Sequence, residues 1–285
     1  MIPGTRESIE KIYEASQLPT TALHDPDAAH LVVDHNRVLG SHLVPGLRAE
    51  VDSRPDGVGL QIEVDEGTVI QKPVHICFGM SPQEGLQAIE LDVHMRQDAH
   101  VDFLAHCAFP FARRIEHRMG ARIRLDAGAA YTYRERHVHG PEGGVQVVPR
   151  ARIELGERAR LRTEFELLRG RVGEIDIDYE TICGPYSVME MDARIDGRGD
   201  DRIRIREVGT LAGEGARGVL TSRIAVRDRA TAEVHNELTA DAAGTIGHVD
   251  CKEIVRDEAT AAAVPIVLVR HPRAHVTHEA AVGSV

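Results

Sequence analysis

Three residues near the C-terminal end of the sequence have side chains of the types that bind transition metals. Cys251 is followed 28 residues later by Glu279, which comes directly after His278 in the run HVTHEAAVGSV. A thiolate, an imidazole and a carboxylate are all metal ligands. A zinc protease helix would read H-E-x-x-H, with two imidazoles one turn apart, but the run here is HEAAV. The protease interpretation therefore fails, and only the fold can decide whether the three side chains meet.

Short alternating runs predict that most of the chain is β-strand. From about residue 60 to the end, apolar and polar residues alternate in runs bounded by Gly and Asp, such as LQIEVDEG, AIELDVHM, ARIRLDAG and EIDIDYETI. This period of two is typical of strands with one buried side. Residues 5–17 instead have helical spacing, and a loop-rich passage follows through PDGVG at 55–59. We therefore expect an N-terminal helical and loop region at 1–59 and an all-β domain at 60–285.

The predicted strands resemble one another at a nearly fixed interval. Ala99, Ala129 and Ala159 occupy equivalent places in three runs, in two steps of 30, and A-T-A at 230–232 recurs at 259–261, a step of 29. A repeat of this length indicates stacked units, each of which buries its face on its neighbour. Successive coils of a β-helix fit this pattern best, and a β-sandwich is the alternative on pattern alone.

Stacked coils would bring distant residues of the C-terminal segment together. Residues one repeat apart lie on adjacent coils, about 4.8 Å apart, so Cys251 and Glu279 could converge. Alternation places Val276, His278 and Ala280 on one face, which we expect to point inward, with His278 partly buried and Glu279 outward. A bulge would be needed for the last two to reach one ligand. On spacing alone, the three residues are an ordinary buried thiol, a hydrogen-bonded core histidine and a solvated glutamate.

Composition and missing motifs exclude several functions. The formal net charge of −11 argues against binding to nucleic acid. The sequence has no apolar run of membrane-spanning length and no signal-peptide core in MIPGTRESIEKIYEASQ, so we expect a cytoplasmic protein that does not associate with membranes. It also has no C-x-x-C pair, no P-loop and no G-x-S-x-G motif.

The remaining cysteines and one histidine pair have ordinary structural interpretations. Cys77, Cys107 and Cys183 are scattered, and we expect reduced thiols that are buried as small apolar residues. His137 and His139 in HVHG share one strand face, which makes them a possible metal pair. Taken alone, such a pair is more typical of a solvated strand end.

The stretch from about residue 230 to the end resembles the C-terminal core of the SufB/SufD family of iron–sulfur cluster assembly scaffolds. The resemblance is carried by the A-D-A-x-G turn in ADAAGTIGHVD, by Cys251, by Pro265 in the apolar strand and by PRAHVTHEA. Weaker similarity extends back to VDEGTVIQKPVHICFG at 64–79. The family fold is a right-handed parallel β-helix, so the resemblance implies that 60–285 is a SufBD core domain.

The resemblance also implies a role for each of the three C-terminal residues. SufB-type members use a cysteine at the position of Cys251 and a glutamate at that of Glu279 to build the nascent cluster, and SufD-type members use a histidine at the position of His278. This sequence holds all three, so it is similar to SufB or to a single-scaffold version. One soft thiolate combined with a carboxylate or an imidazole gives exchangeable iron ligation.

The implied function is a scaffold without catalytic residues that builds a transient iron–sulfur cluster for apoproteins. The implied partners are a SufC-type ABC ATPase and a second chain, in a homodimer or a SufB/SufD-type heterodimer with the cluster at the interface. Two other interpretations remain. A β-helix lyase or hydrolase would use paired carboxylates, but 4% aromatic residues and no Trp argue against a sugar-binding cleft. In an inert structural interaction protein, Cys251 would be only a buried thiol.

Overall fold

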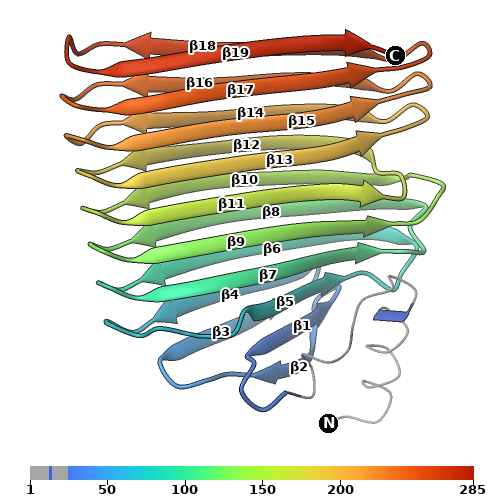
Figure 1. The fold of residues 1–285 in the computed structure, drawn as a ribbon. Helices are drawn as coiled ribbons and strands as arrows, with labels where there is room; N and C mark the ends of the chain where they lie inside the picture. Colours follow the sequence, from blue (N-terminus) through green and yellow to red (C-terminus); the bar gives the residue numbers. More distant parts are fainter. Residues whose placement is uncertain (1–12, 15–24) are drawn as a thin grey trace.

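The computed structural model describes residues 13–14 and 25–285, and this part of the chain is almost entirely β-strand (Figure 1). The predicted helix at 5–17 lies outside the described residues apart from Tyr13 and Glu14, which are helical. Within the described ranges, no helix is long and apolar enough to cross a bilayer. The strands are β1 (His30–Asp34), β2 (Arg37–His42), β3 (Leu47–Arg54), β4 (Gly57–Val64), β5 (Val74–Gly79), β6 (Glu84–Met95), β7 (His100–Phe109), β8 (Arg114–Leu125), β9 (Ala130–His139), β10 (Val145–Leu155), β11 (Arg160–Arg169), β12 (Gly173–Cys183), β13 (Val188–Gly197), β14 (Arg202–Leu211), β15 (Arg217–Val226), β16 (Thr231–Ala240), β17 (Ile246–Val255), β18 (Thr260–Val269) and β19 (His275–Ser284).

The strands form two facing sheets. Each coil of the solenoid contributes one strand to each sheet. One sheet has the order β19-β17-β15-β13-β11-β9-β7-β5-β1-β2, and the other has the order β18-β16-β14-β12-β10-β8-β6-β4-β3. Neighbours are parallel except in the β1–β2 and β3–β4 pairs. In Figure 1 the odd-numbered strands from β7 onward cross the near side to the right, and the even-numbered strands from β6 onward return behind them as the chain climbs, which is a right-handed coil. The predicted parallel β-helix is confirmed, and the β-sandwich alternative is wrong.

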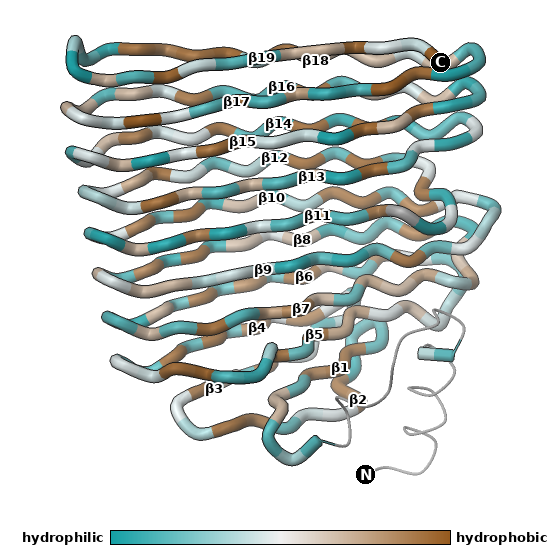
Figure 2. Tube along the Cα trace, in the orientation of Figure 1, coloured by the Kyte–Doolittle hydropathy of each residue, from teal (hydrophilic) through white to brown (hydrophobic). Residues whose placement is uncertain are grey.

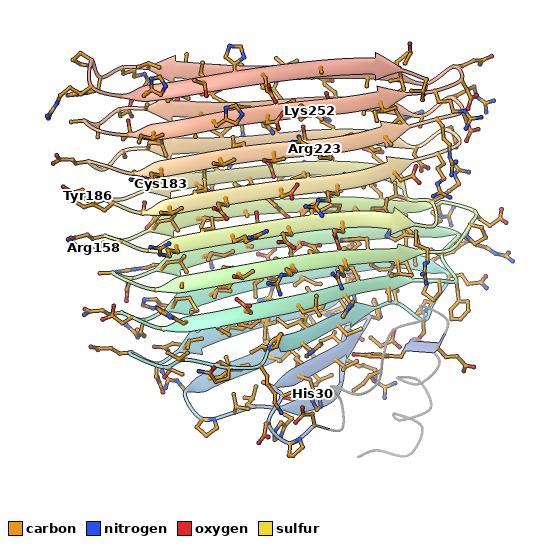
Figure 3. The ribbon with its side chains drawn as sticks, viewed as in Figure 1. His30, Arg158, Cys183, Tyr186, Arg223 and Lys252 are labelled. Atoms are coloured by element: carbon orange, nitrogen blue, oxygen red, sulfur yellow. The ribbon has the colours of Figure 1, made fainter. Side chains whose placement is uncertain are left out.

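The pairing register confirms the repeat length. His100 pairs with Ala130, a step of 30, whereas Arg217 pairs with Ile246, a step of 29. In each coil from β6 to β17, the turn that leads from an even-numbered strand to the next odd-numbered strand contains a residue with positive φ. This backbone conformation suits a tight turn and favours Gly or Asp. The Arg158 guanidinium also lies 5.6 Å from the centre of the Tyr186 ring at this turn (Figure 3). The positive-φ residues of this turn are Asp98, Gly128, Arg158, Tyr186, Gly215 and Gly244.

The core fills the space between the two sheets. Alternate residues of each strand point inward, as the alternating colours along the tube in Figure 2 indicate, and the largest fully buried side chains include Phe78, Phe103 and Phe109. All four cysteines are buried and free, as predicted. The solvated position expected for His137 and His139 is wrong, because both lie on the inward face of β9 and are 3% and 5% exposed.

The segment expected to be loop-rich contains strands. β1, β2 and β3 lie within it, and β4 begins at Gly57 and crosses the boundary predicted between 59 and 60. Arg54 pairs with Gly57, so PDGVG supplies a two-residue turn at Pro55 and Asp56 rather than a long loop. The expectation failed because Pro, Asp and Gly mark a tight hairpin turn as readily as a longer loop. The division of the chain into two domains stays a prediction.

Candidate functional site

Cys251 is buried in the penultimate strand of the ten-stranded sheet. It lies on β17, points into the solenoid and is 0% exposed. In the pairing register it stacks above Ser222 of β15 and below Ala280 of β19. Burial raises the pKa of the Cys251 thiol to about 11, partly opposed by a hydrogen bond with Ser222, while Glu253 raises the pKa further. The thiol therefore keeps its proton at neutral pH unless a metal displaces it.

The register places Cys251 and Glu279 on opposite faces of the sheet. The step from β17 to β19 is 29 residues, not 28, so Glu279 stacks above Asp250 and Cys251 stacks below Ala280. Successive side chains of a strand point to opposite faces, and a shift of one residue exchanges the two sets. The thiol and the carboxylate therefore do not converge within one chain, although the 28-residue spacing had left this possible. Glu279 points outward, as predicted.

His278 shares the face of Cys251. It stacks above the fully buried Val249, and the β17–β19 register is continuous, without the bulge that would turn His278 and Glu279 to one side. The side chain is exposed rather than partly buried. The reason is its position in the last coil, which no other described strand covers. The structure thus places a thiol and an imidazole on the inner face and the carboxylate on the outer face.

Glu279 belongs to a charged group on the outer face of β17 and β19. Lys252 donates hydrogen bonds to Glu279 over 2.5 Å and to Asp250 over 3.3 Å, and Arg223 pairs with Asp250 (Figure 3). Partial burial raises the pKa of Asp250, but the hydrogen bonds from Arg223 and Lys252 outweigh it and hold the pKa below its usual value. Ligand atoms of His248, Asp250 and Glu279 lie within 4.8 Å of one another. In the isolated chain, two cations already neutralise the two carboxylates.

Sequence reasoning missed a group of buried polar residues in the coils around Cys251. Ser222, Asn236, Glu207 and Glu253 are at most 2% exposed, and Ser222 donates a hydrogen bond to Glu253 over 3.1 Å. Both polar side-chain atoms of Asn236 and one carboxylate oxygen each of Glu207 and Glu253 have no hydrogen-bond partner among the described residues. A signal was present in the sequence, because Glu207 occupies an inward position in the alternating run RIRIREVGTL.

Replacement of Glu207 by glutamine is expected to stabilise the protein at alkaline pH. Burial raises the pKa of Glu207 to about 8, and the Asp192 carboxylate contributes to the increase. Between the ordinary carboxyl pKa and this raised value, the native state holds a proton that the unfolded state has lost, so stability falls as pH rises through this window. A tenfold change in proton affinity corresponds to about 1.4 kcal/mol, which sets a ceiling of roughly 4 to 5 kcal/mol.

Urea unfolding of both chains at about pH 5 and about pH 8 measures this effect. The stability of Glu207→Gln relative to the unsubstituted chain should increase from the lower to the higher pH. Glu233→Gln, on the exposed outer face of β16, is the matched control. A difference between Glu207→Gln and the unsubstituted chain that is the same at both pH values would contradict the buried-acid explanation.

The fold and the site together define a parallel β-helix protein whose last coils carry a buried thiol, an imidazole and a carboxylate. No family model matches the chain. The chain is 30% identical over 279 residues to iron–sulfur cluster assembly SufBD family proteins of Methanocaldococcus jannaschii and Pyrococcus horikoshii, which covers 98% of this chain and 88% and 85% of those relatives. A second protein of that family from P. horikoshii is 25% identical over 235 residues, which covers 80% of this chain and 51% of the relative.

This chain belongs to the iron–sulfur cluster assembly SufBD family. The family resemblance read from the sequence is confirmed, and the family supports a role in iron–sulfur cluster assembly.

Proposed function

We propose that this chain is a non-enzymatic scaffold on which a labile iron–sulfur cluster is built and from which it passes to apoproteins. Membership of the SufBD family supports the role. The observation that carries the assignment to this end of the solenoid is the placement of Cys251, a buried thiol beneath the last coil, with His278 on the same face one coil above.

The ligand set follows from the two faces of the sheet. Cys251 supplies a thiolate once iron displaces its proton, because a metal ligand must be deprotonated. His278 is the second ligand from the same face, and its exposure lets iron enter and leave. Glu279 reaches the cluster only after its ion pair with Lys252 opens. A site with one thiolate and weaker nitrogen or oxygen ligands releases iron more readily than a site with four thiolates.

A second chain completes the site at the free edges of the two sheets. Among the described strands, β18 and β19 each have only one hydrogen-bonded neighbour, and an exposed strand edge is a template for pairing with another chain. Val267 and Val276 pack only partly against the core, while Val269 and Val282 are 51% and 48% exposed. We propose a homodimer formed through this end, which brings two sets of ligands together; a heterodimer with another SufBD chain would use the same edges.

The proposed ATPase partner rests on family membership. We propose that a SufC-type ABC ATPase binds the scaffold and opens the dimer interface during assembly or transfer. Such a movement would give iron and sulfur access to Cys251, which has no exposed surface and would become covered further in a dimer.

Anaerobic reconstitution of the full chain with ferrous iron and sulfide tests the function. We expect the dimer fraction from size-exclusion chromatography to retain iron and acid-labile sulfide in similar amounts, with visible absorption, and to pass both to an added apo-ferredoxin. A dimer fraction that retains neither element, with the ATPase present or absent, would overturn the scaffold assignment.

A further inference from the structure

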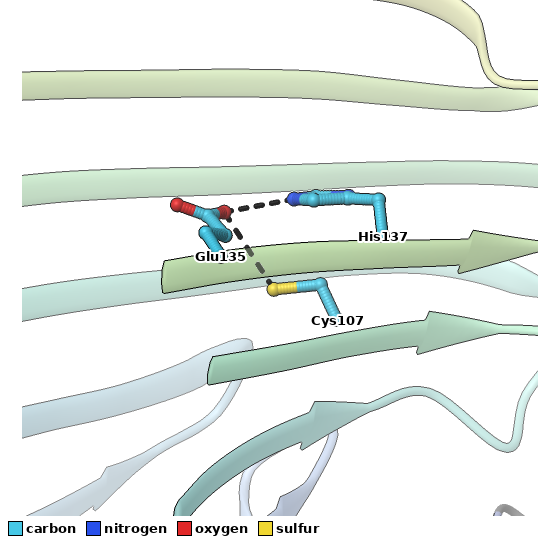
Figure 4. Close-up of side chains that lie close together, drawn as sticks. All are labelled: Cys107, Glu135 and His137. Carbon is cyan, nitrogen blue, oxygen red and sulfur yellow. Dashed lines mark hydrogen bonds and ion pairs between the residues drawn. The ribbon is translucent and has the colours of Figure 1, made fainter. Parts of the chain in front are cut away.

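We propose that the interior of this β-helix contains a second metal site, separate from the cluster site, which binds one divalent transition-metal ion such as Zn²⁺ or Fe²⁺. Three of its ligands are Cys107 of β7 and Glu135 and His137 of β9, whose ligand atoms lie within 4.8 Å of one another (Figure 4). We assign the fourth ligand to His117 of β8, whose Nε2 is buried with no hydrogen-bond partner among the described residues. β9 and β17 are four strand spacings apart in their sheet, which is about 19 Å. The site therefore does not depend on the function proposed for Cys251.

Three of the ligands converge within one chain without rearrangement of the backbone. Cys107 and His137 are stacked partners on adjacent coils, Glu135 lies two positions before His137, and all three are at most 3% exposed. His137 Nε2 lies 2.8 Å from Glu135 Oε1, and Cys107 Sγ lies 3.7 Å from the same oxygen. A tetrahedral ion with bonds of about 2.0 to 2.3 Å separates its ligand atoms by roughly 3.3 to 3.8 Å. Small side-chain rotations reach this geometry.

The hydrogen bonds of Gln87 hold His117 in the tautomer that a metal requires. The side-chain nitrogen of Gln87 donates to the carbonyl oxygens of His35 and Gly79 over 3.0 and 2.9 Å. Its oxygen therefore faces His117 Nδ1, 3.0 Å away, and this nitrogen must be the donor. His117 Nε2 is then unprotonated, and it is buried with no hydrogen-bond partner among the described residues. Its ring centre lies 6.0 Å from that of His137.

The surroundings fix the orientation of both imidazoles. His137 Nδ1 lies 3.2 Å from His139 Nε2, which gives the nitrogen opposite the proposed metal a partner. Phe109 packs 4.9 Å from the His117 ring centre, and Phe165 packs 4.7 Å from that of His137. An imidazole ligand whose second nitrogen is hydrogen-bonded and whose ring cannot rotate is the arrangement found in protein metal sites.

Charge also favours a divalent cation at this position. Among the described residues, Glu135 has no hydrogen bond or ion pair with a lysine or an arginine; its partners are Cys107 and His137. An isolated buried carboxylate is costly, and burial raises the pKa of Glu135 to about 7 in the absence of an ion. A divalent ion neutralises one thiolate and one carboxylate, and its binding releases the thiol proton and any proton on the carboxyl group.

Cobalt(II) and zinc(II) binding to the metal-free full chain tests the site. We expect one ion per chain, a thiolate-to-cobalt charge-transfer band, tetrahedral ligand-field bands, and a melting temperature that rises with zinc. Cys107→Ser should abolish the charge-transfer band and the zinc-dependent rise. Cys251→Ser is the matched control and should retain both, which separates this site from the cluster site.

A second variant tests the site in case Cys107→Ser does not fold. His117→Gln removes the proposed nitrogen ligand and should weaken cobalt affinity by at least tenfold. The site is overturned if the folded chain takes up no cobalt or zinc, if neither variant changes binding, or if the charge-transfer band disappears in Cys251→Ser instead.

Discussion

Replacing Cys251 with serine is expected to reduce the acid-labile sulfide retained by the reconstituted protein, and the iron that accompanies this sulfide, to background. Cys251 is the only cysteine in the last three strands of the chain, and the other three lie on β5, β7 and β12. A serine hydroxyl keeps its proton under conditions in which iron displaces that of a thiol. The fold should survive, because the neighbouring Ser222 and Glu253 already form a polar buried environment that accepts a hydroxyl.

Iron and acid-labile sulfide per chain, measured after anaerobic desalting, give the size of this effect. Cys183→Ser is the matched control, since Cys183 is equally buried and its thiol pKa is also raised, to about 12, by burial. The control should load like the unsubstituted chain. Equal loading of Cys251→Ser and Cys183→Ser would show that Cys251 is an ordinary buried thiol.

A lysine at Val267 is expected to weaken the proposed dimer by a hundredfold or more. Val267 lies on β18, stacks above the buried Leu238 and is itself only partly buried in one chain. In the monomer, a lysine here can extend its ammonium group to water. In a dimer closed over this end, the charge would be buried without a partner, which costs several kcal/mol, and about 2.8 kcal/mol already corresponds to a hundredfold change in the dissociation constant.

Sedimentation velocity over a range of concentrations measures the dissociation constant, and reconstitution of the same samples measures the cluster. Val219→Lys, on the exposed outer face of β15, is the control and should dimerise normally. We expect Val267→Lys to lose dimer and cluster together. If Val267→Lys leaves the dissociation constant unchanged, the dimer interface does not include β18. If the unsubstituted chain stays monomeric, the result favours the heterodimer.

The strands and their repeat were predictable because each coil is subject to the same local constraint. A coil must bury one face of each strand and turn within a few residues, so alternation and turn residues recur in the sequence. The N-terminal hairpin was missed because the run LRAEVDSR is followed directly by Pro55, Asp56 and Gly57, residues that fit a loop as well as a tight turn.

The sequence named the candidate ligands of the site, whose role stays a prediction, but it did not fix their arrangement. Steps between successive coils are 28 residues from Arg160 to Val188 and 29 from Val188 to Arg217, so the sequence does not reveal which step applies between Cys251 and the last strand. A difference of one residue exchanges the inner and outer faces. The spacing left open that Cys251 and Glu279 converge, and the register excludes it within one chain. The inward placement of His278 and the outward placement of Glu279 were predicted correctly, because alternation within one strand does not depend on register.

The sequence by itself determined the fold class and the family, because these depend on local alternation and on residue identity. It also named three C-terminal candidate ligands, whose role stays a prediction. Only the tertiary structure decided which side chains meet. The pairing of Glu279 with Lys252, and the burial of Cys107, Glu135 and His137 with His117 from the opposite sheet, arise from contacts between different strands. The cumulative register of the coils sets these contacts, and no single segment of the sequence encodes them.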